Sequence, residues 1–384
     1  MDDLAINGGK PVSKTKILMA KPIFSKKTIS DIEEVVSSGN IRQGPKTLEF
    51  ENEFRKKVGA EHAYAANSGT AALHIAFMSI LEKGDEVLVP AFTFIATAST
   101  IALSGGRPVF VEIDEETFMI DTEDTKEGIT SKTKAIAPVH LFGNAADMKA
   151  LGEIAEDHDL LLVNDAAQAH GTEINGKDIG SFNDLNCYSF YPTKTMTTGE
   201  GGMVTTNNQR FLETGKLIRS HGEASRYNHT VLGLNYRMTE IAAVIGLEQL
   251  EHLDDFLVKR RKNAAVLTEG LKTIDGLRPQ RVREGINHSY SYYSIVMDPY
   301  AFSCDRDEFV QALEFENIEC SVHYPIPLNE QQIFKRLYGE KKCPVSEDIS
   351  QTIFSVPVHP SLSEKDLASI IAALEKVSSY YLKQ

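Results

Sequence analysis

Short apolar runs alternate with helical patterns through the first half of the chain, and this alternation constrains the fold most. The runs "DEVLVP", "RPVFVEID", "KAIAPVHLFG" and "LLLVNDA" predict strands, whereas "TFIATASTIALSGG" and "NAADMKALGEIAEDH" predict helices. Strands that alternate with helices form a mostly parallel sheet, and near-continuous apolar strands such as "DLLLVND" are buried on both faces. The sequence therefore predicts an α/β fold in which helices cover both faces of a mostly parallel sheet.

A long helical pattern over residues 242–271 separates this region from the C-terminal part of the chain. Beyond it, "HSYSYYSIVM" predicts a strand, and "DRDEFVQALEFENI" and "SEKDLASIIAALEKV" predict helices. Near the N-terminus, Ser25 is a suitable N-cap for a helix that ends at Gly39. We predict a large domain over residues 1–250, which includes an N-terminal arm, and a smaller α+β domain over residues 251–384.

Charge and cysteine spacing narrow the classes of partner. The 384-residue chain has a formal net charge of -14, which argues against a broad nucleic-acid-binding face. Four widely spaced cysteines fit a reducing cytoplasm and argue against a zinc site or a disulfide framework: Cys187, Cys304, Cys320 and Cys343. The N-terminus lacks the apolar core of a signal peptide, and the most apolar stretch, Val87–Leu103, contains Pro90 and is short for a bilayer. We expect a cytoplasmic protein with no metal, nucleic acid or membrane as a partner.

The segment "NSGTAAL" lies where a predicted strand ends and a helix begins. Ser68, Gly69 and Thr70 occupy this turn. Free N–H groups and the helix dipole make such a turn a site for a phosphate group. The alternative is an ordinary helix N-cap formed by Ser68 or Thr70.

Two further segments place polar residues at strand ends. Asp165 follows the apolar run "LLLVN", at the edge where open α/β sheets bind ligands, and we expect Gln168 and His170, which come soon after, to face the same cleft. The alternative for Asp165 is a cap on the next helical turn. Lys194 follows the strand that carries Ser189 and precedes the loop "TTGEGG". A lysine becomes a nucleophile when burial lowers the pKa of its amine, and the alternative is a solvated loop lysine.

A phosphate site, a strand-end carboxylate and an entering lysine together match the needs of pyridoxal 5′-phosphate (PLP). The phosphate needs an anion site, the pyridine nitrogen needs a carboxylate that keeps it protonated, and the aldehyde needs a lysine amine. Phe94, in "AFTFIAT", is a ring that can stack on the cofactor. In so apolar a run, Phe94 can equally be an ordinary core residue.

The chain resembles the PLP-dependent sugar aminotransferases of the DegT/DnrJ/EryC1/StrS family. The matching motifs are "NSGTAALHIA", "VPAFTFIATA", "PVHLFGN", "DAAQAHG", "SFYPTK", "GEGG", "HG", "LNYRMTEIAA" and "VHYPIPL". They occur in the family's order and span nearly the whole chain. The resemblance implies the type I, aspartate-aminotransferase-like fold, with PLP converting to pyridoxamine phosphate during the reaction.

The resemblance also implies a role for each matching residue. Lys194 would form the internal aldimine and move the proton, Asp165 would pair with the pyridine nitrogen, and Gln168 would lie near the phenolic oxygen. Phe94 would stack on the ring. The phosphate would be held by residues from the helix start and the adjacent strand: Ser68, Gly69, Thr70 and Ser189.

Asn235, in "LNYRM", would reach the phosphate of the neighbouring subunit, so the resemblance implies a homodimer with shared active sites. One branch of the family has histidine in place of the lysine and removes a hydroxyl group, and Lys194 therefore favours transamination. The family often has an acidic residue where this chain has Asn164. We expect the side chain of Asn164 to point away from the ring, because neighbouring strand residues face opposite sides.

The resemblance implies that glutamate donates the amino group to a nucleotide-linked 3-keto or 4-keto deoxysugar. The candidate substrate contacts are Arg42, His221, Arg237, His323 and Tyr324, and each can instead be a surface or interface residue. The opening "LAINGGKPV" resembles a branch that acts on keto-cyclitols, so keto-inositol with glutamine as donor stays an alternative. The pathway, whether surface polysaccharide or secondary metabolite, stays open.

Two other classes of function are compatible with these residues. Some relatives of this family were first described as regulators, and a fold alone does not establish chemistry, so a non-catalytic binding module is one alternative. A Schiff-base aldolase that uses Lys194 without a cofactor is another. That reading gives no purpose to Asp165 or to the "NSGTAAL" turn, and we rank it last.

Overall fold

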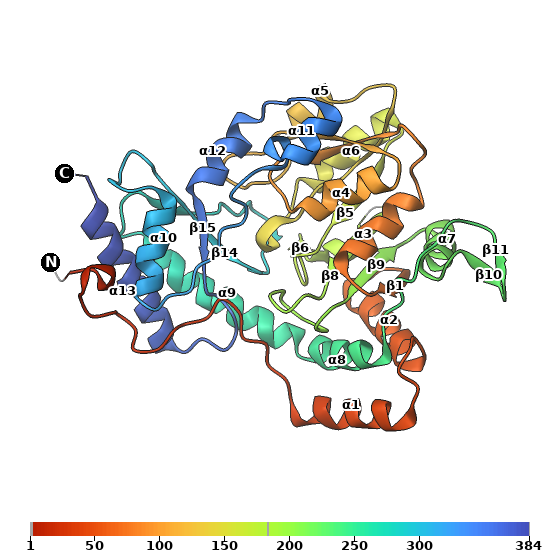
Figure 1. The fold of residues 1–384 in the computed structure, drawn as a ribbon, viewed down its shortest axis with the longest axis horizontal. Coiled ribbons are helices and arrows are strands. Elements are labelled where there is room, and N and C mark those ends of the chain that lie inside the picture. The colour runs from red at the N-terminus through yellow and green to blue at the C-terminus, as the bar shows by residue number, and fades with distance from the viewer. Residues whose placement is uncertain (1–2, 183, 384) are drawn as a thin grey trace.

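The computed structural model describes residues 3–182 and 184–383. Its centre is a seven-stranded sheet with the order β1-β9-β8-β5-β4-β2-β3 (Figure 1). The strands are β1 (His62–Ala66), β2 (Glu86–Pro90), β3 (Arg107–Val111), β4 (Thr133–Ile136), β5 (Leu161–Asp165), β8 (Leu185–Ser189) and β9 (Gly202–Thr206). Neighbouring strands of this sheet are parallel except in the two pairs that contain β9. The predicted α/β class with a mostly parallel sheet is confirmed.

Helices cover both faces of this sheet. One core contains side chains from α2 (Pro45–Val58), α6 (Met148–His158) and α8 (Glu240–Glu251). A second core contains side chains from α3 (Gly69–Met78), α4 (Ile95–Leu103) and α7 (Gln209–Arg219). In β5, Leu162 belongs to the first core and Val163 to the second, as the two-residue period of a strand requires. Both faces are apolar, which explains the near-continuous apolar runs.

The C-terminal elements form a third core around a three-stranded antiparallel sheet. It comprises β12 (Leu277–Pro279), β14 (Tyr293–Met297) and β15 (Ile353–Val356), packed with α9 (Leu253–Leu271), α10 (Arg306–Phe315) and α13 (Glu364–Tyr381). The N-terminal arm adds Leu4 and Ile17 to this core. The buried carboxylate of Glu316 holds the arm by accepting hydrogen bonds from the backbone of Ala5 and Val12, each at 2.9 Å. The domain boundary after residue 250 stays a prediction.

The helical pattern over residues 242–271 is two helices and not one. α8 ends at Glu251, α9 begins at Leu253, and His252 lies between them at φ -98° and ψ 0°. The new helix starts with Asp254 and Asp255, which suit the positive end of a helix dipole. Apolar periodicity continues across the junction, so it did not signal the break.

The remaining elements are short or peripheral. α1 (Lys26–Ser38) begins and ends as predicted, since Ser25 accepts a hydrogen bond from the backbone of Thr28 and Gly39 adopts a φ of 71°. The others are α5 (Thr122–Glu127), β6 (Glu173–Ile174), β7 (Lys177–Asp178), β10 (Glu223–Ser225), β11 (Asn228–His229), β13 (Ile286–Asn287), α11 (Gln332–Tyr338) and α12 (Pro344–Thr352). Within residues 3–182 and 184–383, no helix combines the length and apolar character that crossing a membrane requires.

Candidate active site

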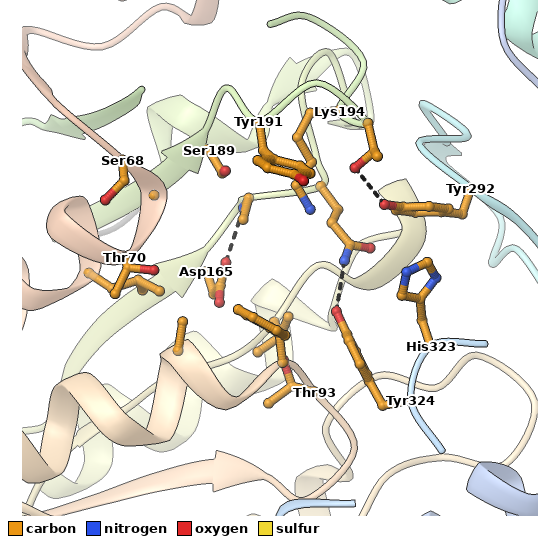
Figure 2. Close-up of a pocket in the computed structure, with 18 of the residues that line it drawn as sticks. Ser68, Thr70, Thr93, Asp165, Ser189, Tyr191, Lys194, Tyr292, His323 and Tyr324 are labelled. Atoms are coloured by element: carbon orange, nitrogen blue, oxygen red, sulfur yellow. Dashed lines mark hydrogen bonds between the residues drawn. The ribbon is translucent and has the colours of Figure 1, made fainter. Parts of the chain in front are cut away.

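A cavity of about 320 Å³ lies where the carboxyl ends of β5 and β8 meet the start of α3 (Figure 2). Figure 2 shows Ser68 and Thr70 at one end, Tyr292, His323 and Tyr324 at the other, and Asp165 and Lys194 between them. Ten of the residues predicted from the sequence line this cavity: Ser68, Gly69, Thr70, Phe94, Asp165, Gln168, Ser189, Lys194, His323 and Tyr324. Four predicted residues do not line it: Arg42, His221, Asn235 and Arg237.

The start of α3 forms one end of the cavity. Ser68 is the N-cap, and its hydroxyl accepts a hydrogen bond from the backbone of Ala71 at 3.1 Å. Gly69 and Thr70 are the first two helical residues, where backbone N–H groups have no partner within the helix. The N-cap interpretation is therefore correct for Ser68, and it leaves the N–H groups of Gly69 and Thr70 available for an anion.

Two glycines allow three segments to converge at this end. A Cβ atom on Gly69 would lie 2.5 Å from the Cβ of Ser189, so only glycine lets the strand end approach the helix start. A Cβ atom on Gly202 would lie 2.3 Å from the carbonyl oxygen of Ser68. The Ser189 hydroxyl thus lies beside the N-terminus of α3. A hydroxyl next to free N–H groups is a donor set that fits a phosphate group.

Asp165 is buried at the end of β5, with 4% of its surface exposed. One carboxylate oxygen accepts a hydrogen bond from the Thr97 hydroxyl at 2.7 Å, and the other accepts one from the backbone of Ala167 at 3.0 Å. Burial raises the pKa of Asp165, whereas these two bonds and the charge of Lys194 lower it. The turn-capping interpretation is thus partly right, but the carboxylate also lines the cavity, where it can pair with a cationic N–H group.

Lys194 lines the cavity and is not a solvated loop residue. Its side chain is partly buried, and its ammonium nitrogen lies 5.8 Å from the centre of the Tyr292 ring. Burial lowers the pKa of Lys194 to about 8, although the charge of Asp165 opposes this shift. Among the side chains that the structure describes, no carboxylate forms a salt bridge with this amine. An amine that is easily deprotonated and unpaired suits a nucleophile.

The side chain of Gln168 has a fixed orientation. Its carbonyl oxygen accepts a hydrogen bond from the backbone of Phe142 at 2.6 Å, so its amide group must be the donor to the Tyr324 hydroxyl, 3.1 Å away. The amide has a second N–H for a ligand oxygen. Tyr324 accepts the first N–H, which leaves its own proton free to be donated.

Aromatic rings form the mouth of the cavity. Phe94 is 53% exposed and its ring centre lies 5.9 Å from that of Tyr324, so the core interpretation of Phe94 is wrong. The His323 ring packs on Tyr292 at 4.5 Å, and the Tyr292 hydroxyl is 2.8 Å from that of Thr193. Burial, followed by the charge of Lys194, lowers the pKa of His323 to about 4, so this ring is neutral at physiological pH.

Two neighbouring residues from the sequence analysis, Asn164 and His170, have clear outcomes. Asn164 is fully buried and its side chain donates to that of Asn186 at 2.7 Å, away from the cavity as expected. His170 is also buried, but its ring packs on Tyr188 and Phe190 and does not line the cavity. The prediction that His170 faces the cleft is therefore wrong, because its ring packs into the aromatic core formed by Tyr188 and Phe190.

The four predicted residues outside the cavity lie on two segments, the loop before α2 and the chain that leads into α8, and hydrogen bonds connect these segments. The buried carboxylate of Glu240 accepts hydrogen bonds from the backbone of Gly44, Lys46 and Thr47 at 2.8–2.9 Å, which ties α8 to the loop that carries Arg42. Arg42, His221 and Asn235 are exposed and Arg237 is half-buried. Asn67, next to the start of α3, donates its side-chain amide to the backbone oxygen of Asn235 at 3.3 Å.

Sequence reasoning missed Thr97, Thr193 and Tyr292. Thr97 follows Phe94 by one helical turn, so its position in the "TFIATA" segment could have indicated it. Tyr292 comes from the C-terminal part of the chain, about a hundred residues from Lys194, and no local pattern links the two. Within the described ranges, no cluster of three His, Cys, Asp or Glu side chains is arranged to hold a metal ion.

Comparison with known proteins identifies the type of site. A family model described as the DegT/DnrJ/EryC1/StrS aminotransferase family matches residues 22–375. A pleiotropic regulatory protein of Geobacillus stearothermophilus is 38% identical, over 91% of this chain and 93% of that protein. A UDP-N-acetyl-3-dehydro-alpha-D-glucosamine 3-aminotransferase of Acidithiobacillus ferrooxidans is 34% identical, over 91% of this chain and 93% of the enzyme. The crystal structure of S. venezuelae DesV with a ketimine intermediate superposes with a TM-score of 0.87 at 31% identity, covering 92% of this chain and 94% of that one.

Proposed function

This chain belongs to the DegT/DnrJ/EryC1/StrS aminotransferase family, and on that premise we propose that it transfers an amino group from glutamate to a nucleotide-linked keto sugar. It is a PLP-dependent transaminase with the fold of its family. The observation that carries the proposal is the convergence of Lys194, Asp165 and the start of α3 on one cavity. When bound, PLP supplies an electron sink that stabilises a carbanion next to the amino group.

The residues of the cavity fit PLP, and we propose a task there for each of the following. The N–H groups of Gly69 and Thr70, with the Ser189 hydroxyl, would bind the phosphate. The carboxylate of Asp165 would accept the pyridine N–H group, and the free N–H of Gln168 would bind the phenolic oxygen. The exposed ring of Phe94, which lines the cavity, would cover one face of the heterocycle.

Lys194 would act twice in each half of the reaction. Its amine would bind the cofactor covalently, and after an amino donor releases it, the same amine would move the α-proton of the donor as base and then as acid. No other amine lines the cavity among the residues that the structure describes. The keto sugar would then receive the amino group that the donor gave up, by the same steps in reverse, which predicts ping-pong kinetics.

The sugar acceptor is inferred from relatives and from the shape of the cavity mouth. The Acidithiobacillus ferrooxidans enzyme acts, by its name, on a UDP-linked 3-keto sugar. In this chain, the hydroxyl of Tyr324 and the neutral ring of His323 offer hydrogen bonds beside Lys194, which suits the hydroxyl groups of a sugar. We therefore propose that the acceptor is a nucleotide-diphosphate-linked keto sugar. The enzyme would aminate it at carbon 3 or 4 during the biosynthesis of an amino sugar.

We further propose a homodimer in which a second copy completes each site. Arg42, His221, Asn235 and Arg237 lie outside the cavity of their own chain, where they are free to serve a neighbour. The hairpin of β10 and β11 projects from the body of the molecule (Figure 1), and the adjoining Leu232 is 86% exposed. An exposed apolar group on such a projection suits a protein interface. A monomer in sedimentation experiments would contradict this arrangement.

The acceptor can be tested with the pyridoxamine phosphate form of the protein. Nucleotide-linked 3-keto and 4-keto sugars are added separately, and recovery of the aldehyde form is followed by its absorbance. We expect recovery with a nucleotide-linked keto sugar and none with the same sugar lacking its nucleotide. Recovery with keto-inositol alone would show that the acceptor proposed here is wrong, while leaving the transaminase chemistry intact.

The lowered pKa of Lys194 predicts how fast the cofactor-free protein captures PLP at each pH. Only the neutral amine attacks, so capture should slow by about tenfold per pH unit below the pKa of about 8 and level off above it. The rate is measured by borohydride reduction and mass determination of the Lys194 peptide. In Asp165→Asn, which lacks the charge that raises this pKa, the midpoint should move lower. A midpoint close to the ordinary lysine value of 10.5 would contradict the assignment.

A further inference from the structure

Thr97 is a fully buried residue in the first turn of α4, directly behind the cavity. Its hydroxyl lies 2.7 Å from one carboxylate oxygen of Asp165 and 3.3 Å from the backbone oxygen of Phe94. A hydroxyl has one proton to donate. The shorter contact is to an ionised acceptor, and hydrogen bonds to charged groups are the stronger ones, so the proton goes to Asp165.

The hydroxyl of Thr97 forms a different kind of hydrogen bond from that of Thr100, one turn further along the same helix. Thr100 is equally buried, but its hydroxyl donates to the backbone oxygens of Ala96 at 2.7 Å and Thr97 at 3.1 Å. That is the ordinary way in which a helical threonine satisfies its hydroxyl. Thr97 instead reaches across from α4 to β5, so its hydroxyl serves another element of the fold.

The two oxygens of Asp165 are held from two directions. The backbone N–H of Ala167 holds one oxygen and the hydroxyl of Thr97 holds the other, and these donors belong to different segments of the chain. Two such contacts fix the plane of the carboxylate. Each oxygen still has a free lone pair, so the carboxylate can accept one further N–H group from the cavity side.

We propose that Thr97 is a positioning residue, which holds the carboxylate of Asp165 ionised and correctly oriented for the pyridine nitrogen of PLP. This inference rests on PLP binding in the cavity, as given above, but not on the identity of the sugar. Burial alone would favour the neutral acid, which has no negative charge to pair with a protonated ring. The hydrogen bond from Thr97 opposes the effect of burial, and it lowers the pKa of Asp165 more than any other single contact does.

The test compares Thr97→Val, which keeps the shape of the side chain and removes the donor, with Thr97→Ser, which keeps the hydroxyl. Thr100→Val is the matched control, because it removes a hydroxyl that is equally buried on the same helix but bonds only backbone oxygens. The dissociation constant of PLP is measured by equilibrium dialysis for the parent protein and the three variants. We expect about a tenfold weaker binding for Thr97→Val and less than about a threefold change for the other two.

A cofactor analogue separates positioning from general damage to the fold. In 1-deazapyridoxal phosphate, a C–H group replaces the ring nitrogen, so it forms no hydrogen bond with Asp165. Thr97→Val should therefore bind this analogue as tightly as the parent protein does. With PLP, the pH midpoint of the bound cofactor's visible absorbance should rise in Thr97→Val. A less protonated ring withdraws electron density less strongly, so the nitrogen that joins Lys194 to the cofactor would have a higher pKa.

If Thr97→Val loses as much affinity for the deaza analogue as for PLP, the proposal is overturned, since Thr97 would then have a role in packing only. An unchanged affinity and an unchanged pH midpoint in Thr97→Val would overturn it as well. If the parent protein itself fails to bind PLP, the proposed function fails first, and that result is distinct from either outcome for Thr97.

Discussion

Replacing Lys194 with alanine is expected to lower transamination by about 10⁴-fold or more, the upper range for loss of a general acid–base group. The amine lines the cavity, and burial lowers its pKa to about 8, so in the intact protein it can bind the cofactor aldehyde and move the proton. The variant loses both tasks at once. The rate is followed in single turnovers of the PLP-loaded protein with glutamate.

Two controls show whether the loss is chemical. Lys194→Arg keeps a positive charge next to Asp165 but has no nucleophile, so it should be about as inactive as Lys194→Ala. Methylamine fits the space left by the truncated side chain, so it should restore part of the proton transfer in Lys194→Ala. It should not raise the rate of the parent protein, which has its own amine. Parent-like turnover in Lys194→Ala would refute the role given to this residue.

The same lysine distinguishes an enzyme from a regulatory module. The relative from Geobacillus stearothermophilus is named as a pleiotropic regulatory protein, so the question is a real one for this family. A catalytic protein should be yellow with PLP, and borohydride should attach the cofactor to a single peptide that contains Lys194. A colourless protein without this adduct would contradict the roles proposed here for Lys194 and the cavity.

Residues at strand ends could be predicted from the sequence because chain order alone places them. Asp165 and Ser189 each end a buried strand of a parallel sheet, so their side chains must emerge at the same edge. Lys194 follows within a few residues, and the start of α3 follows the end of β1. These four features needed only the strand–helix alternation and the direction of the strands.

Other features of the site depend on contacts between segments far apart in the chain. Tyr292 and His323 reach the cavity from the C-terminal elements, and only the packing of those elements against the large sheet brings them there. Helical spacing from Phe94 could have placed Thr97 near the cavity, but only the structure shows that its hydroxyl bonds to Asp165. Arg42 and Asn235 were predicted from motifs that match the family, but within a single chain neither residue lines the cavity.

Replacing Asp165 with asparagine is expected to slow transamination by about 10²- to 10³-fold, the cost of removing one partner from a buried ion pair. The carboxylate is 4% exposed and holds two hydrogen bonds, both of which asparagine can preserve only in part. Without the negative charge, the pyridine nitrogen is no longer kept protonated, and the ring withdraws electrons less strongly. The effect should fall on kcat, measured at saturating glutamate.

The stability of Asp165→Asn should fall only when the cofactor is bound. In the cofactor-free protein, an ionised carboxylate in a buried site is costly, so its removal should leave the unfolding midpoint unchanged or raise it. In the PLP-bound protein, the midpoint should fall, because the variant binds the ring less tightly.

A second variant tests whether Asp165 acts through the ring nitrogen. Asp165→Ala loaded with N1-methyl pyridoxal phosphate, whose ring charge is permanent, should recover part of the lost rate. Failure of this permanent charge to restore any activity would mean that Asp165 acts on something other than the ring nitrogen.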